Sequence, residues 1–269
     1  HGGAGPREGR ERRRGLRVAD RHPILRTVFL WENVTSPHQA VISGLRIPFE
    51  WLNWSDVMDA ELDVRLETFL AKDATKGFDL ATGPLMRLAV IRLASDSYKM
   101  AWTFHHLLLD GWSLQRVLGE VLETYEASRQ GRTLQLSLSR PYRAFIDYVK
   151  RRPAGESEAY WRGLMQGLTE PTPLPLERPT EEASGIGSHT AVLSAEMAEQ
   201  LQFLARKRQL TLGTFIQGAW AYLLSRYTGS SDVVFGITVA GRPTDLDGSD
   251  AMVGLFINTL PIRVQVDAE

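Results

Sequence analysis

The chain of 269 residues contains no cysteine, has no apolar run long enough to cross a membrane, and carries a formal net charge of only -1 at pH 7. The absence of cysteine excludes disulfides, thiolate metal sites and a cysteine nucleophile, and it fits the reducing cytoplasm. The first residues lack the charged and apolar pattern of a signal peptide. Balanced charge gives no electrostatic attraction to nucleic acid or to an anionic membrane. We therefore expect a cytoplasmic protein that binds neither nucleic acid nor membrane.

Several catalytic motifs are missing as well. The HExxH, GxSxG, Walker and CxxC patterns do not occur, so metalloprotease, serine hydrolase and nucleotide-binding chemistry have no local support. We predict no metal site. The content of 43% hydrophobic and 23% charged residues is ordinary for a globular chain.

Residues 1–15 differ in kind from the rest of the chain. They include five arginines, two glutamates and five glycines, with almost no apolar residues. Such a segment cannot bury enough apolar surface to offset the entropy that it loses on ordering. We predict that 1–15 is a disordered end or a stretch that is not native sequence. A basic arm that binds a partner is the alternative.

Apolar periodicity predicts a chain of mixed helices and strands. In the first part, a strand is expected at 24–31, a helix at 61–72, and a strand at 85–93 paired with 98–106. A helical stretch at 142–168, broken near Pro153, follows. After it come a short strand, helices at 195–207 and 212–227, and a strand at 232–239.

Proline and glycine are concentrated in 169–187, which predicts a linker. We place this linker at 179–187, between an N-terminal lobe of 16–178 and a partial C-terminal lobe of 188–269.

The segment from Trp102 to Ser113 holds the strongest candidate for a site. It places His105 and His106 side by side at the end of a predicted strand, ahead of a helix with apolar residues at helical spacing. Because side chains alternate along a strand, only one of the two histidines is expected to face a cleft. A lone histidine on an apolar strand is more often a core residue, but the whole pattern favours acid or base chemistry.

Three residues that follow the histidines have expected roles of their own. Asp110 lies where the chain turns, and a carboxylate buried there needs a cation. Gly111 has no Cβ and lets the backbone approach a ligand closely. Ser113 is a plausible N-cap for the helix that follows.

Three further segments narrow the interpretation: 21–29 (RHPILRTVF), 77–87 (GFDL and GPLMR) and 253–263 (VGLFINTLPIR). Together with the double-histidine motif, they resemble in content and order the motifs of condensation domains of nonribosomal peptide synthetases. The resemblance extends from about residue 16 to the C-terminus.

The resemblance implies a chloramphenicol acetyltransferase-like α/β fold, an α+β two-layer sandwich of two lobes in a V, with the second lobe incomplete here. In the tunnel between the lobes, such an acyltransferase-type enzyme joins a donor acyl or peptidyl thioester to the amine of an acceptor aminoacyl thioester. Upstream donor and downstream acceptor carrier proteins deliver both substrates on phosphopantetheine arms. The resemblance thus implies no permanently bound cofactor, and the other partners would be the adjacent synthetase domains.

The resemblance also implies roles for particular residues. His106 is the active-site histidine, and Gly111 lines the tunnel beside the thioester. His105 is mainly structural, and Asp110 is a structural carboxylate that pairs with Arg26.

In the second lobe, Asn258 and Arg263 belong to a motif near the same tunnel. This pattern resembles condensation domains better than the related epimerisation domains. Ala144 and Ala240 replace the aspartate and serine that are frequent in the family's corresponding motifs. The family's opening motif and its later second-lobe motifs have no counterpart, so this chain alone is expected to be incomplete. An epimerase, a stand-alone acyltransferase and a non-catalytic unit that only docks carrier proteins remain as alternatives.

Overall fold

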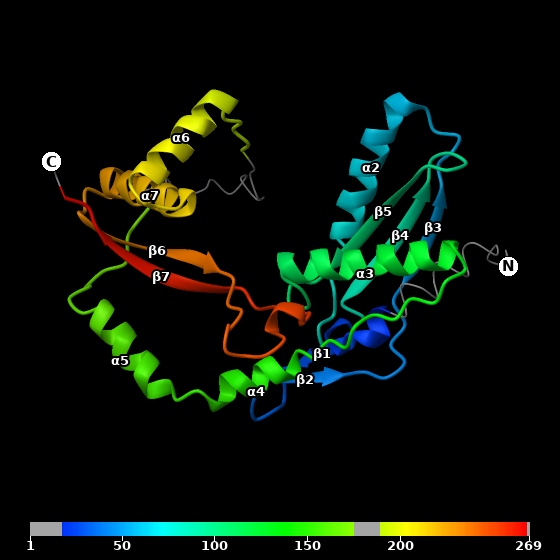
Figure 1. Cartoon of the computed structure of the whole chain (residues 1–269), viewed down its shortest axis with the longest axis horizontal. Coiled ribbons are helices and arrows are strands. Elements are labelled where there is room, and N and C mark those ends of the chain that lie inside the picture. Colours follow the sequence, from blue (N-terminus) through cyan, green and yellow to red (C-terminus); the bar gives the residue numbers. More distant parts are fainter. Residues whose placement is uncertain (1–17, 175–188, 268–269) are drawn as a thin grey trace. The chain divides into compact units, whose positions relative to one another are not determined.

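The computed structural model describes residues 18–174 and 189–267, which form both helices and strands (Figure 1). Contacts divide the chain into two compact units. The first contains the chain up to Arg152 and the segment Ala240–Ile257, and the second contains Pro153–Val239 and the chain from Asn258. The segment 1–15 and the linker predicted at 179–187 lie outside the described residues.

These compact units do not coincide with the expected lobes, 16–178 and 188–269. The stretch Pro153–Val239 belongs to the second unit, and the segment Ala240–Ile257 belongs to the first unit. Met252, Val253 and Phe256 are at most 2% exposed and join the hydrophobic core of that unit. The buried side chains of this segment thus pack in the first compact unit, and the lobe boundaries stay a prediction.

A three-stranded sheet organises the first unit. Its strands lie in the order β3 (Phe49–Asn53), β4 (Met86–Arg92) and β5 (Tyr98–Phe104). β3 runs parallel to β4, and β4 runs antiparallel to β5. The predicted pairing of 85–93 with 98–106 is therefore confirmed.

Helices α2 (Asp59–Ala74) and α3 (Gly111–Arg129) contact opposite faces of this sheet. Asp73 of α2 bonds to Arg87 and Thr103, which are cross-strand partners on one face. On the other face, Trp102 and residues of α3 line one apolar cavity. The predicted helix at 61–72 is confirmed, with one added turn at its ends.

The smaller elements of the first unit follow the motif at 21–29. A 3-10 turn, η1 (Pro23–Arg26), precedes β1 (Thr27–Leu30), so the predicted strand at 24–31 begins three residues later than expected. β1 pairs antiparallel with β2 (His38–Val41). The remaining elements are α4 (Arg143–Arg151) and η2 (Ser249–Ala251).

The second unit contains a two-stranded antiparallel sheet with a small core. Ala221, Leu224 and Val233 form this core. The predictions at 195–207 and 232–239 match the observed bounds, but the short strand predicted before them is wrong, because 189–194 pair with no described strand. The elements are α5 (Ala154–Leu164), α6 (Ala195–Lys207), α7 (Leu212–Thr228), β6 (Asp232–Val239) and β7 (Asn258–Gln265). Across the described ranges, no helix is both long and apolar enough to cross a membrane.

Candidate active site

The two histidines lie in a turn directly after β5 and not on the strand itself. The amides of Leu108 and Leu109 close this turn by donating to the carbonyl oxygens of His105 and His106, at 3.0 and 3.3 Å. Strand alternation therefore does not apply to the pair, but the turn separates them. The side chain of His106 is exposed, whereas His105 is partly buried and its Nδ1 accepts the Leu107 amide at 3.2 Å.

Asp110 is 2% exposed and begins α3. Its Oδ1 accepts the Ser113 amide at 2.8 Å, so Asp110 and not Ser113 is the N-cap. Its Oδ2 accepts the amide of Phe256 at 3.0 Å. Arg242 approaches Oδ1 with Nη2 at 3.4 Å and supplies the cation that a buried carboxylate needs.

The predicted pairing of Asp110 with Arg26 is wrong. Arg26 donates instead to the carbonyl oxygens of Ala19 and Ile42, at 3.1 and 3.0 Å, and its Nε lies 3.9 Å from Asp20. Its guanidinium therefore stabilises the chain around η1. Arg242 belongs to the segment Ala240–Ile257, which packs in the first unit and is called the returning segment below.

The Ser113 hydroxyl joins α3 to the VGLF motif. It donates to the carbonyl oxygen of Gly254 at 2.7 Å, and it accepts the Gly254 amide at 3.1 Å and Arg242 Nη2 at 2.8 Å. A Cβ added to Gly254 would lie 2.0 Å from the Tyr142 ring, so this position requires glycine. We refer to Asp110, Ser113, Arg242 and Gly254 as the Asp110 cluster.

Burial and opposite charges shape the electrostatics of this cluster. Burial lowers the pKa of Arg242, and the negative charge of Asp110 opposes that shift. Burial, helped by Asp110, raises the pKa of Tyr142 to about 12, and the Tyr142 hydroxyl donates to the carbonyl oxygen of Leu255. The opposite charges of Asp110 and Arg242 therefore compensate each other inside this cluster.

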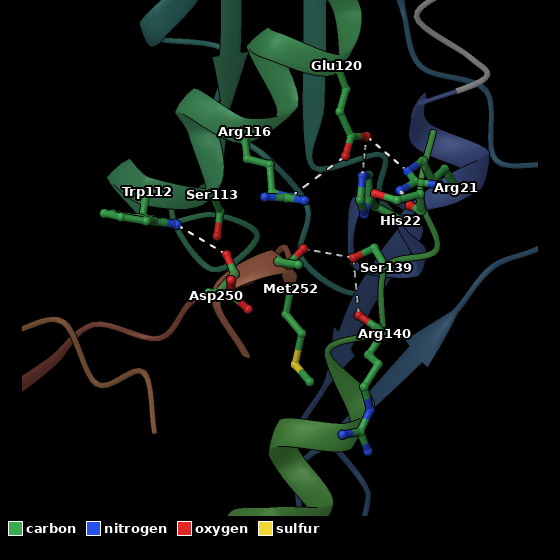
Figure 2. Close-up of polar contacts among 12 residues, drawn as sticks. Arg21, His22, Trp112, Ser113, Arg116, Glu120, Ser139, Arg140, Asp250 and Met252 are labelled. Atoms are coloured by element: carbon green, nitrogen blue, oxygen red, sulfur yellow. Dashed lines mark hydrogen bonds and ion pairs between the residues drawn. The ribbon is translucent and has the colours of Figure 1, made fainter. Parts of the chain in front are cut away.

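A second polar cluster joins the middle of α3 to the motif at 21–29, as Figure 2 shows. Glu120 lies 2.7 Å from His22 Nε2 and 3.1 Å from Arg21 Nε, and Arg116 approaches it at 3.8 Å. Burial acts to raise the pKa of Glu120, but the hydrogen bond with His22 and the charges of His22, Arg21 and Arg116 outweigh it and lower that pKa. His22 is 3% exposed and has a packing role.

Figure 2 also shows that the first turn of α3 contacts the returning segment. Trp112 Nε1 donates to the carbonyl oxygen of Asp250 at 3.3 Å, and Ser139 donates to that of Ala251 at 2.8 Å. The segment at 250–251 is therefore held both by the start of α3 and by the chain that follows α3.

Asn258 and Arg263 lie in β7 of the second unit. Asn258 is exposed, and its side-chain oxygen accepts the Thr259 amide at 2.9 Å. Arg263 forms an ion pair with Asp232 at 2.6 Å and donates to the carbonyl oxygens of Leu164 and Gln166. Their place beside a tunnel stays a prediction. Within the described part of the chain, no group of three or more His, Asp or Glu residues could hold a metal ion.

The family model called Condensation domain matches residues 16–269. The chain belongs to the condensation-domain family. This condensation domain is 44% identical over 251 residues to one protein of the linear gramicidin synthase of Brevibacillus parabrevis, and 41% identical over 260 residues to another protein of the same synthase. The matches cover 92% and 94% of the chain but only 5% and 3% of those proteins.

Solved structures have the same fold. SgcC5 from Streptomyces globisporus matches with a TM-score of 0.77 and 24% identity, over 96% of this chain and 59% of that one. The first condensation domain of the CDA synthetase gives a TM-score of 0.73 with 22% identity, over 96% and 62% of the two chains. These matches confirm the chloramphenicol acetyltransferase-like α/β fold that the family resemblance implies.

Sequence reasoning missed the roles of Arg242, Gly254 and Tyr142 in this condensation domain. The need of buried Asp110 for a cation was a usable signal, but it does not select one arginine among many. Gly254 of the VGLF motif could be noted from the sequence. The need for glycine there comes from the Tyr142 ring, 112 positions earlier, which leaves no room for a Cβ.

Proposed function

We propose that this condensation domain forms an amide bond between a donor acyl or peptidyl thioester and the amine of an acceptor aminoacyl thioester. Carrier proteins deliver both substrates on phosphopantetheine arms, and the reaction is one step of nonribosomal peptide synthesis. The observation that supports this proposal is an exposed imidazole, His106, on a turn whose two flanking elements are both held by buried polar contacts.

Gly111 supports the proposal because the packing of the fold gives no reason for a glycine at this position. Beyond its chain neighbours and the backbone of its own helix, a Cβ at Gly111 would meet no protein atom within 4 Å, and the backbone is not in the left-handed region. Packing therefore does not require glycine at the start of α3. Close approach of a substrate beside His106 gives a reason for it.

Magnitudes indicate what the site must supply. A free α-amine has a pKa near 7.7–8.0, so roughly a tenth is neutral at pH 7, and complete deprotonation would contribute only about 1.4 kcal/mol. Holding amine and thioester in attack geometry contributes about 7–11 kcal/mol. Positioning therefore dominates, and proton handling by His106 adds a factor of about 10²–10⁴.

In the proposed reaction, the acceptor nitrogen attacks the donor carbonyl carbon and forms the C–N bond. His106 accepts a hydrogen bond from the amine and takes its proton as the tetrahedral adduct forms. The adduct then breaks its C–S bond, and the proton passes to the leaving thiolate. The donor arm leaves as a thiol, and the lengthened chain stays on the acceptor arm.

The test is an intact-mass time course with an acyl-loaded donor carrier protein and an aminoacyl-loaded acceptor carrier protein. It is run with this chain, with a longer form that includes the sequence flanking it in its gene, and with His106→Ala in each. His38→Ala is the matched control, because His38 is an exposed histidine of β2 in the same unit.

We expect acyl mass to move to the acceptor and His106→Ala to slow the transfer by about 10²–10⁴-fold, with His38→Ala unchanged. Full rate in a folded His106→Ala variant would contradict the proposal. Absence of transfer by the longer form would favour epimerisation or docking alone. Chiral analysis of the recovered aminoacyl groups separates those two.

A further inference from the structure

Arg87, in the motif at 77–87, carries a guanidinium held by several hydrogen bonds. It lies near the turn that contains His105 and His106, which we call the histidine turn. Arg87 Nε donates to both carboxylate oxygens of Asp73, at 2.7 and 2.9 Å, and its Nη atoms donate to the carbonyl oxygens of Asp73 and Gly77. Asp73 is 6% exposed and also accepts the Thr103 hydroxyl at 2.6 Å. Asp73 and Gly77 thus fix the orientation of the Arg87 guanidinium, and Thr103 of β5 in turn holds the Asp73 carboxylate.

An aromatic ring connects Arg87 to the first histidine. The Arg87 guanidinium carbon lies 4.4 Å from the centre of the Phe78 ring, within the range of a cation–π contact. The same ring meets the His105 imidazole edge-on, with 6.4 Å between the ring centres and an angle of 85°. Phe78 is therefore placed between a fixed cation and His105.

The far side of His105 is held by the turn itself. Its Nδ1 accepts the Leu107 amide at 3.2 Å, and because an amide can only donate, this nitrogen carries no proton. The arrangement thus requires the neutral tautomer with the proton on Nε2. Leu107 follows His106 directly, so a rotation of the His105 ring would break a bond inside the turn that presents His106.

We propose that Phe78 and Arg87 are positioning residues that hold His105 in one ring orientation and one tautomer, and thereby fix the turn that carries His106. The kinetic part of this inference rests on the proposed function of His106. The orientation and tautomer of His105 do not depend on it.

Two variants separate positioning from simple packing. Phe78→Leu keeps an apolar side chain but removes the ring, whereas Phe78→Tyr keeps the ring. If Phe78 only fills space, leucine should be tolerated at least as well as tyrosine. Arg87→Lys retains a charge opposite Asp73 but loses the planar group that stacks on the ring.

The matched control is Phe69→Leu. Phe69 lies on α2 near Asp73, but its ring packs against Trp54 with 6.0 Å between the ring centres. This substitution makes the same chemical change at a ring of the same unit that packs against a different aromatic residue.

The experiment records imidazole nitrogen shifts of the histidine-labelled protein, with His105→Gln to assign the signals, and then kcat and KM for amide formation. We expect the Nε2-protonated tautomer of His105 in the wild type, Phe78→Tyr and Phe69→Leu, and mixed tautomers in Phe78→Leu and Arg87→Lys. Because a displacement of about 1 Å can cost about a hundredfold in rate, kcat should fall about ten- to a hundredfold in those two variants, with KM unchanged.

An unaltered His105 tautomer in folded Phe78→Leu and Arg87→Lys would overturn the proposal. So would a changed tautomer with unchanged kcat, since the turn would then not depend on His105. Failure of the proposed function has a different signature. In that case His106→Ala leaves amide formation unaffected, while the spectra still report whether Phe78 and Arg87 hold His105.

Discussion

Asp110 occupies a buried position because three donors reach its carboxylate. The amides of Ser113 and Phe256 donate at 2.8 and 3.0 Å, and Arg242 supplies the opposite charge at 3.4 Å. Removing either partner of such a buried pair destabilises the fold, because the remaining charge is left without compensation. The carboxylate therefore stabilises the first unit and also fixes the start of α3 next to His106.

The ion pair makes a prediction at the scale of single residues. Asp110→Ala and Arg242→Ala should each lower the free energy of unfolding by about 3–5 kcal/mol, and the double variant should lose much less than their sum. Urea unfolding of the single and double variants gives the coupling energy. His106→Ala, at an exposed position, should stay within about 0.5 kcal/mol of the wild type.

Arg26 supplies the matched control for this cycle, because it donates to backbone carbonyl groups. Asp110→Ala and Arg26→Ala should combine additively, to within about 0.5 kcal/mol. A coupling of Asp110 to Arg26 as large as that to Arg242 would reinstate the pairing that the family resemblance implies. Equal stability of Asp110→Ala and His106→Ala would contradict a structural role for Asp110.

At the scale of elements, a buried carboxylate ties each main helix of the first unit to its surroundings. Asp73, in the last turn of α2, binds Arg87 of β4 and Thr103 of β5. Glu120, in the middle of α3, binds His22 and Arg21 ahead of η1. The strand and the helix that flank the histidine turn are thus both held by charged contacts.

The tie between α2 and the sheet predicts an acid-sensitive step. The pKa of Asp73 is lowered from 3.8 to about 2, mainly by the hydrogen bond from Arg87. The unfolded chain therefore binds more protons than the folded state between these values, so stability present above 3.8 is lost as the pH falls towards 2.

We predict that Asp73→Asn lowers the melting temperature at neutral pH and flattens its decline between pH 3.8 and about 2. Circular dichroism melts across this range measure both effects. Asp63→Asn, at a side chain 87% exposed on the same helix, is the control and should leave the curve unchanged. An equally steep decline in Asp73→Asn would show that another group carries the acid sensitivity.

At the scale of the whole molecule, the two units differ in how well they cover their apolar side chains. Among the described residues of the second unit, the hydrophobic core is a small cluster of Ala221, Leu224 and Val233. On α6 and α7, Phe203 is 60% exposed, Ile216 is 58% exposed and Tyr227 is 65% exposed. Exposed apolar patches favour association.

We predict that this chain self-associates as its concentration rises and that Phe203→Gln combined with Ile216→Gln weakens the association. Sedimentation velocity over a range of concentrations measures it. Val64→Gln with Leu122→Gln is the matched control, since these side chains of the first unit are 65% and 63% exposed. An equal effect of both pairs would show that α6 and α7 are not the associating surface.

The amino-acid sequence by itself determined most elements and the place of the double-histidine motif between a strand and a helix. The helix at 195–207 was predictable because periodicity and the cap Ser194 are local, and Gly229 ends α7 for the same reason. The histidine motif was recognisable because its residues are consecutive. The strand predicted near 189 failed because a strand needs a partner, which a local pattern does not supply.

Only the tertiary structure decided which residues hold the site. The partner of Asp110 is Arg242, 132 positions away, and not Arg26. Ser113 meets Gly254 across 141 positions. Residues this distant meet only when the segment that contains them returns to the first unit. Their pairing depends on the packing of the whole unit, whereas a helix or a motif is determined by residues that are neighbours in the sequence.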